Sequence, residues 1–308
     1  MNNASKWFLG ILSLFIGLAI LIFALSIYTF TTAFVDVTRV DENEFTSGTT
    51  TESVAVVELN DVIITSEEIV RQLRKYQKNK LVKAIVLRVN SPGGGVAPSQ
   101  EIYDEVRKTR DAGKPVVVSM SSVAASGGYY VALGASKIVA NSGTITGSIG
   151  VISQFTNFSN LMKKIGIENT TIKSGKFKDS GSPFREMDEE DKAYFQSAID
   201  DVYGQFVEAV AKERKLPIES VRAIADGRIY TGTQAYRLKL IDTLGTFQTA
   251  IRIAGVLGKI SGDPRIVKEH KPKPLFEQLM GSRFYQKIEN VTPPFQPSSF
   301  IEYRLLEK

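Results

Sequence analysis

Residues 84–95 read Ala-Ile-Val-Leu-Arg-Val-Asn-Ser-Pro-Gly-Gly-Gly, and a second apolar run at 116–120 leads into Ala-Ala-Ser-Gly-Gly-Tyr-Tyr at 124–130. In both places a run of strand-forming residues stops at glycines and a helical pattern follows. Other expected strands span 54–59, 137–140, 149–153 and 168–173. The alternation predicts an α/β domain in which crossover helices cover a largely parallel sheet.

The expected helices alternate with these strands, and one of them is unusually long. Residues 189–215 repeat apolar side chains at helical spacing, and Asp188 is a suitable N-cap. The other expected helices span 66–78, 98–111, 126–134, 156–165, 232–238 and 246–256, with a short one starting at Pro217.

Composition excludes several classes of function. The chain has 308 residues and a net charge of +5, and its acidic and basic clusters alternate along the sequence. We find no basic stripe with interleaved aromatic residues, so nucleic acid is not an expected partner. The chain contains no cysteine, which rules out disulfides and thiolate metal sites.

The N-terminal part has the composition of a membrane anchor. Residues 7–35 carry no charge, and about 20 apolar residues suffice to cross a bilayer. Lys6 precedes the run and mainly acidic residues follow it, which predicts that the rest of the protein lies outside the cytoplasmic membrane. We therefore divide the chain into a cytoplasmic N-terminus (1–6), a transmembrane anchor (7–35), a tether (36–52), the α/β domain (53–262) and a C-terminal tail (263–308).

Ser126 is the candidate nucleophile. It lies between small residues after an apolar strand, in a chain whose one histidine, His270, falls in a charged stretch interrupted by prolines. A serine nucleophile needs a base, and lysine is the base type that remains in quantity. Taken alone, Ser126 is better explained as a helix N-cap. Gly127 and the turn at Gly93 change this balance, because their backbone N–H groups can form an oxyanion site.

The loop at 173–183 is a reasonable place for a catalytic lysine. It reads Lys-Ser-Gly-Lys-Phe-Lys-Asp-Ser-Gly-Ser-Pro and so offers three lysines beside Phe177 and glycines. A lysine base must be neutral, which requires burial in a site poor in hydrogen-bond donors. Most lysines are solvated surface charges, so the loop by itself does not single out one of them.

Three motifs in this order resemble the short, single-domain form of bacterial signal peptide peptidase A, also called protease IV. They are Asn-Ser-Pro-Gly-Gly-Gly at 90–95, Ala-Ser-Gly-Gly-Tyr-Tyr at 125–130 and Lys-Ser-Gly-x-x-Lys at 173–178. The resemblance covers roughly residues 53–258 and implies a Clp-protease/crotonase-like fold. It implies a membrane-tethered serine protease of the bacterial cytoplasmic membrane that degrades cleaved signal peptides.

The same resemblance assigns roles to individual residues. Ser126 matches the nucleophile and Lys178 the general base, while Gly93 and Gly127 match the oxyanion donors. Ser148 matches a serine that hydrogen-bonds the lysine and orients it. No metal or cofactor is implied, and apolar peptides are the expected substrates. A ring-like homo-oligomer is also expected. In one form of this assembly, each substrate groove is built from two adjacent chains.

Two other functions stay open on sequence grounds. A crotonase-type acyl-CoA enzyme shares the fold and the glycine turn, but it does not explain the anchor or the run around Ser126. A non-catalytic, membrane-anchored scaffold of protease fold is disfavoured only by the presence of both Ser126 and Lys178.

Overall fold

The computed structural model describes residues 7, 17–18, 21–26, 44–46, 50–269 and 302–304. The chain divides into two compact units, Met1–Glu44 with Lys268–Phe295, and Phe45–Val267 with Gln296–Lys308. The second unit holds the sheet and every candidate site residue. In the described part of the chain no helix is both long and apolar enough to cross a membrane. The expected anchor, 7–35, lies mostly outside the described residues.

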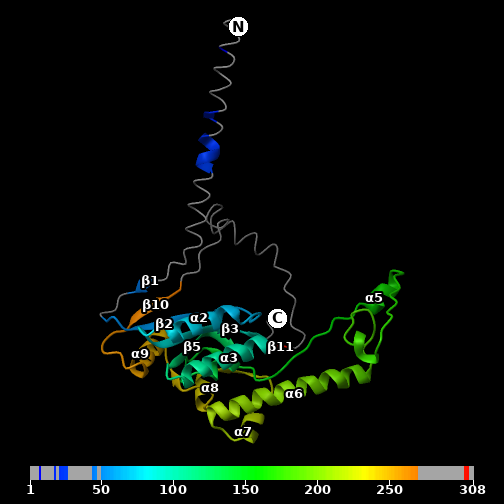
Figure 1. Ribbon diagram of the computed structural model, residues 1–308. Helices are drawn as coiled ribbons and strands as arrows, with labels where there is room; N and C mark the ends of the chain where they lie inside the picture. Colours follow the sequence, from blue (N-terminus) through cyan, green and yellow to red (C-terminus); the bar gives the residue numbers. More distant parts are fainter. Residues whose placement is uncertain are drawn as a thin grey trace. The chain divides into compact units, whose positions relative to one another are not determined.

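The second unit alternates strands and helices in the predicted way (Figure 1). The strands are β1 (Glu44–Thr46), β2 (Ser53–Asn60), β3 (Val82–Ser91), β4 (Gly93–Gly95), β5 (Val116–Ala125), β6 (Lys137–Ala140), β7 (Ile145–Gly147), β8 (Ile229–Thr231), β9 (Thr243–Leu244), β10 (Arg265–Lys268) and β11 (Glu302–Arg304). The helices are α2 (Glu67–Lys78), α3 (Val96–Asp111), α4 (Gly127–Ala132), α5 (Ser159–Lys164), the 3₁₀ helix η1 (Lys176–Asp179), α6 (Glu189–Arg214), α7 (Ile218–Arg222), α8 (Gly232–Arg237) and α9 (Phe247–Leu257).

The main sheet is largely parallel, as predicted. Its order in the described chain is β1-β10-β2-β3-β5-β6-β9, with β7 beside β5 and β8 beside β7. Strands β2, β3, β5, β6 and β9 run parallel to their neighbours in this series, and so does β7 to β5. Strand β8 is antiparallel to β7. A separate pair joins β11 to β4 in antiparallel register.

Both faces of the sheet are buried, which explains the continuous apolar runs in its central strands. On β3, Ile85, Leu87 and Val89 belong to a large core that also contains apolar residues of α2, α3, α4 and α6. The alternate residues Ala84 and Val86 pack on the opposite face against α9. The period-two alternation of side chains along a strand separates the two cores.

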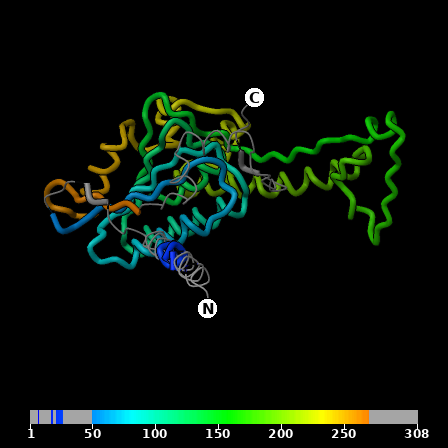
Figure 2. The backbone as a smooth tube through the Cα atoms, turned by 90° about the horizontal axis from the view of Figure 1, so that it is seen from above, coloured from blue at the N-terminus to red at the C-terminus, as the bar shows by residue number. Residues whose placement is uncertain are grey.

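One long segment extends from this core. We call residues 153–195 the arm; it contains α5, η1 and the first turns of α6. Figure 2 shows the arm, in green, extending away from the sheet. Its buried residues are Ser159, Asp191 and Phe195. The C-terminal half of α6 returns to the core, where Phe206 and Val207 are fully buried.

Three segments differ from the sequence-based expectation. The strand expected at 149–153 is replaced by β7 a few residues earlier, and residues 168–173 form no strand. The apolar residues there mimic a strand pattern, yet they belong to the arm, where Ile172 is 97% exposed. Residues 263–308, expected as a tail, contribute β10 and β11. Both strands pair with partners far away in sequence, which a local pattern cannot reveal.

Candidate active site

The candidate residues Gly93, Ser126 and Ser148 lie just past the carboxyl ends of adjacent parallel strands. Ser91 at the end of β3 is opposite Ala124 of β5, and Ala125 is opposite Gly147 at the end of β7. The edge at the carboxyl ends of parallel strands is where open α/β sheets bind ligands. The register therefore brings together three of the predicted positions that lie far apart in the sequence.

Ser126 combines a positive φ with near-complete burial. Its φ is 51° and its ψ −116°, and it is 1% exposed. Its N–H donates to the Gly147 carbonyl at 2.8 Å, and its carbonyl accepts from the N–H of Tyr130 at 2.8 Å. The side chain makes no capping hydrogen bond to α4. The backbone therefore fixes Ser126, and the N-cap explanation of its hydroxyl does not hold.

The glycines at this edge are required by close packing. A Cβ on Gly94, whose φ is +158°, would lie 2.2 Å from the carbonyl oxygen of Ile63. A Cβ on Gly128 would lie 2.9 Å from the carbonyl oxygen of Ser91, so the start of α4 packs directly on the end of β3. These contacts explain why Gly94 and Gly128 have no room for a side chain.

The two predicted oxyanion donors have different surroundings. Gly127 is buried in the first turn of α4, next to Ser126. The N–H of Gly93 donates to the Ser91 hydroxyl at 3.1 Å. An oxyanion at Gly93 would therefore replace or share this bond, and the donor role of both glycines stays a prediction.

The strand of glycines has one edge that pairs with an extended segment. Ile63 donates to the Gly93 carbonyl and accepts from the Gly95 N–H, both at 2.8 Å. In this parallel bridge the N–H and C=O of Gly94 point to the other edge. That edge carries β11 in antiparallel register, with Tyr303 opposite Gly94. Apart from the aromatic residues of the tail, no local pattern indicates this pairing.

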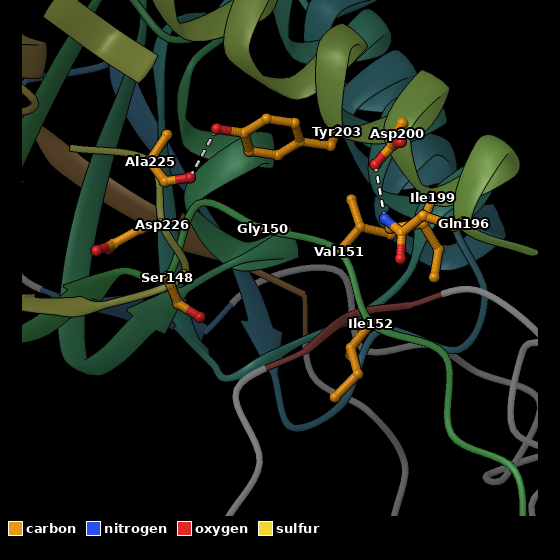
Figure 3. Close-up of a pocket in the computed structure, with 11 residues that line it drawn as sticks. Ser148, Gly150, Val151, Ile152, Gln196, Ile199, Asp200, Tyr203, Ala225 and Asp226 are labelled. Atoms are coloured by element: carbon orange, nitrogen blue, oxygen red, sulfur yellow. Dashed lines mark hydrogen bonds between the residues drawn. The ribbon is translucent and has the colours of Figure 1, made fainter. Parts of the chain in front are cut away.

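Ser148 borders a cavity of about 600 Å³ (Figure 3). Its φ is 50°, and its N–H donates to the Arg228 carbonyl at 2.9 Å. Opposite it, Tyr203 of α6 donates its hydroxyl to the Ala225 carbonyl at 2.9 Å. The cavity is lined by Ser148, Gly150, Val151, Ile152, Gln196, Ile199, Asp200, Tyr203, Ala225, Asp226 and Gly227.

Lys178 lies in η1 on the arm, and the single chain does not bring it to Ser126. Its side chain is exposed and joins no described residue by a hydrogen bond or ion pair. The two other lysines of the loop are paired: Lys173 donates to Asp179 at 2.6 Å, and Lys176 forms an ion pair with Glu190. Of the three, only Lys178 is left available to meet another group. His270 lies outside the described residues.

Comparison with known proteins identifies the family. The model of peptidase family S49 matches residues 108–261. The slr0021 protein of Synechocystis is 42% identical over 235 residues, which are 75% of this chain and 84% of that protein. The chain belongs to peptidase family S49.

Two further relatives specify the chemistry. Protease 4 of Haemophilus influenzae is 37% identical over 210 residues, which cover 65% of this chain and 34% of that protein. The chloroplastic serine protease SPPA of Arabidopsis thaliana is 36% identical over 192 residues, covering 62% and 28% respectively. The chain thus spans about a third or less of these two relatives. Together the matches establish a serine peptidase homologous to SppA and protease 4, and the family match includes Ser126, Ser148 and Lys178.

A polar network in the arm escaped the sequence-based interpretation. Asp191, which is 2% exposed, accepts hydrogen bonds from the Ser180 hydroxyl at 2.5 Å and from both terminal nitrogens of Arg185. Arg185 and then Ser180 hold the pKa of the Asp191 carboxyl well below its usual range. Arg185 and Lys173 likewise lower the pKa of Asp179. The only sequence signal was the acidic start of α6, which reads as an ordinary helix N-terminus.

Acid is expected to loosen the arm before the sheet. Folding lowers the pKa of Asp191. Its carboxylate therefore contributes stability that is fully present above the pKa of the unfolded chain, about 3.9. That stability is lost as the pH falls through the lower folded value. We expect hydrogen–deuterium exchange, corrected for its intrinsic pH dependence, to rise in residues 173–195 between about pH 4 and pH 2. Helix α3 is the internal control; equal rises in both segments would contradict this expectation.

Proposed function

We propose that this protein is a membrane-anchored serine endopeptidase with a Ser126–Lys178 dyad that degrades cleaved signal peptides and other apolar peptides. One observation carries the proposal. Ser126 is buried and its side chain does not cap α4, and it lies beside the glycine strand β4, which pairs with the extended strand β11. We infer a Clp-protease/crotonase-like variant of the α/β fold from the same arrangement of strand ends. The serine peptidase relatives support this chemistry.

The proposed reaction is acyl transfer. Neutral Lys178 takes the proton of the Ser126 hydroxyl as its oxygen attacks a peptide carbonyl. The N–H groups of Gly93 and Gly127 stabilise the oxyanion, and protonated Lys178 then gives its proton to the leaving amine. A water molecule then gives a proton to neutral Lys178 as it attacks the acyl-enzyme carbonyl, and protonated Lys178 returns the proton to the Ser126 oxygen as the acid product leaves. Ser148, which follows β7 beside Ser126, orients the lysine amino group.

The substrate is an extended peptide that lies along β4. The N–H and C=O of Gly94 face the edge that now carries β11, and antiparallel pairing there supplies main-chain hydrogen bonds without regard to sequence. Such a mode suits a protease of broad preference, because backbone pairing gives affinity and side-chain pockets give selectivity. Signal peptides meet this requirement once they are released and unfolded.

The dyad is completed by a second copy of the chain in a ring-like homo-oligomer. Lys178 lies on the arm, and the hydrogen bonds of its loop are made within the arm. The arm also exposes large apolar side chains: Phe158, Leu161, Ile165, Ile167, Ile172, Phe177, Phe184 and Tyr194. Exposed apolar patches of this kind mark protein interfaces. A second copy of the chain that covers the arm would bury these side chains, and Lys178 would then meet Ser126 of that copy.

Ser126→Ala is expected to lower peptide hydrolysis by a factor of about 10³ or more, because it removes the attacking oxygen. It removes only a hydroxyl, so the thermal unfolding midpoint should stay near that of the unchanged protein. Labelling by a fluorophosphonate should be lost at the same time. Ser122→Ala, on the exposed part of the same strand, is the matched control. Hydrolysis retained by the Ser126 variant would place the nucleophile elsewhere.

A mixing experiment tests whether the dyad spans two copies. Ser126→Ala and Lys178→Ala should each be inactive alone, whereas Lys173→Ala and Lys176→Ala should stay active. Co-expression of the two inactive chains in equal amounts should restore about one quarter of the full rate, since a quarter of the sites then pair an intact serine with an intact lysine. Peptide hydrolysis by the purified mixed oligomer measures this. No recovery in a verified mixed oligomer would confine the dyad to one chain.

The uncharged run 7–35 anchors the enzyme to the bacterial cytoplasmic membrane, with residues 1–6 in the cytoplasm and the catalytic unit outside. The full chain should therefore stay with membranes during carbonate extraction, while a chain starting at residue 46 should not. Protease added to intact spheroplasts should digest the catalytic unit. Protection of that unit from the added protease would reverse the proposed orientation.

A further inference from the structure

The turn that carries Lys178 has little structure of its own. Helix η1 is a single 3₁₀ turn with no buried residue, and such turns have poor hydrogen-bond geometry. Its apolar support is the stacking of Phe177 on Tyr194, with ring centroids 5.2 Å apart. A catalytic base must nevertheless be placed within a fraction of an ångström. Other contacts must therefore define where η1 lies.

Asp191 and Arg185 provide those contacts. The two terminal nitrogens of Arg185 bind Asp191, and one of them also binds Asp179, the last residue of η1, at 3.0 Å. The next residue, Ser180, donates its hydroxyl to Asp191 at 2.5 Å. Charge-assisted bonds with two-pronged geometry are the strong, directional kind. They tie the C-terminal end of η1 to a buried carboxylate.

The carboxylate itself is fixed by the start of α6. Asp191 is the third residue of that helix, and it forms a reciprocal capping box with Asp188: the Asp191 N–H donates to the Asp188 carboxylate at 2.8 Å, and the Asp188 N–H to Asp191 at 3.3 Å. Helix α6, which is 26 residues long, runs on from Asp191 into the core of the unit. A rigid path thus leads from the core through Asp191 to η1.

We propose that Asp191, held by Arg185, is a positioning residue that sets the place of the Lys178 amino group for the reaction. This inference rests on the proposed role of Lys178 as the base. Asp191 touches neither substrate nor Ser126; it acts through Ser180, Asp179 and the turn between them. Its burial distinguishes it from its neighbour on α6, Glu190, which makes an exposed ion pair with Lys176 of η1.

The test compares Asp191→Asn with Glu190→Gln in the full-length protein. The asparagine keeps the size of the side chain but loses the charge that binds Arg185. We expect kcat to fall about 10- to 100-fold with little change in KM. A lysine base works only after it has lost its proton, so activity should rise with pH, and the midpoint of that rise should move in this variant. Glu190→Gln should stay within about twofold. Asp191→Glu, which keeps the charge, should recover part of the lost kcat.

Several outcomes would overturn the inference. One is an Asp191→Asn enzyme with unchanged kcat and pH profile; another is a loss of activity that coincides with dissociation in sedimentation or with an unfolded arm, which indicates a structural role alone. If Asp191→Asn does not fold, Arg185→Lys decides: a lower kcat with a shifted pH profile supports the proposal, and an unchanged enzyme rejects it. Lys178→Ala separates the two hypotheses, because an active Lys178 variant rejects the base assignment itself. An inactive Lys178 variant beside a fully active Asp191→Asn rejects the positioning role only.

Discussion

The register between β3, β5 and β7 is the constraint on which the candidate site depends. Ser91 opposite Ala124, and Ala125 opposite Gly147, place three strand ends side by side. A slip of one residue would turn the side chains of β5 to the other face and separate Ser126 from its neighbours. The sheet is buried on both faces, so its two apolar cores hold this register.

The contacts that hold this register also offset the cost of two unusual backbone conformations. Ser126 and Ser148 both have φ near 50°, a backbone region that residues other than glycine rarely adopt. Such conformations cost about 1–3 kcal/mol and persist where the surroundings fix them. Here the bond from the Ser126 N–H to the Gly147 carbonyl joins the two turns directly. Both serines that the reaction is expected to use are therefore among the described non-glycine residues with positive φ.

The parts of the fold that could be predicted are those that local patterns determine. The strand that ends shortly before Gly93 and the strand that ends before Ser126 were recognisable because apolar runs stop close to glycines. The stretch 168–173 shows the same apolar composition without a sheet to join, so the prediction there was wrong. Strands β10 and β11 lie in residues expected as a tail, and their partners are distant in sequence. Motif resemblance selected Lys178, but only the structure showed that it lies on an arm.

The arm and the sheet are stabilised by different forces. Apolar burial holds the sheet, whereas a buried carboxylate and its cationic partners hold the arm around η1. The candidate nucleophile therefore lies in the rigid part of the unit, and the candidate base in a part whose contacts are polar and directional. Their relative placement is then sensitive to single charges in a way that the sheet is not.

An arm that carries half of a dyad also affects when proteolysis can begin. In the proposed assembly, a newly made copy has a serine without a base until it meets other copies in the membrane. Dilution then acts as a restraint, because mass action sets the fraction of completed sites. At the proposed place in the membrane, a peptidase for extended apolar segments would meet proteins still emerging unfolded from secretion. Dependence on encounter between copies would then keep solitary copies harmless to them.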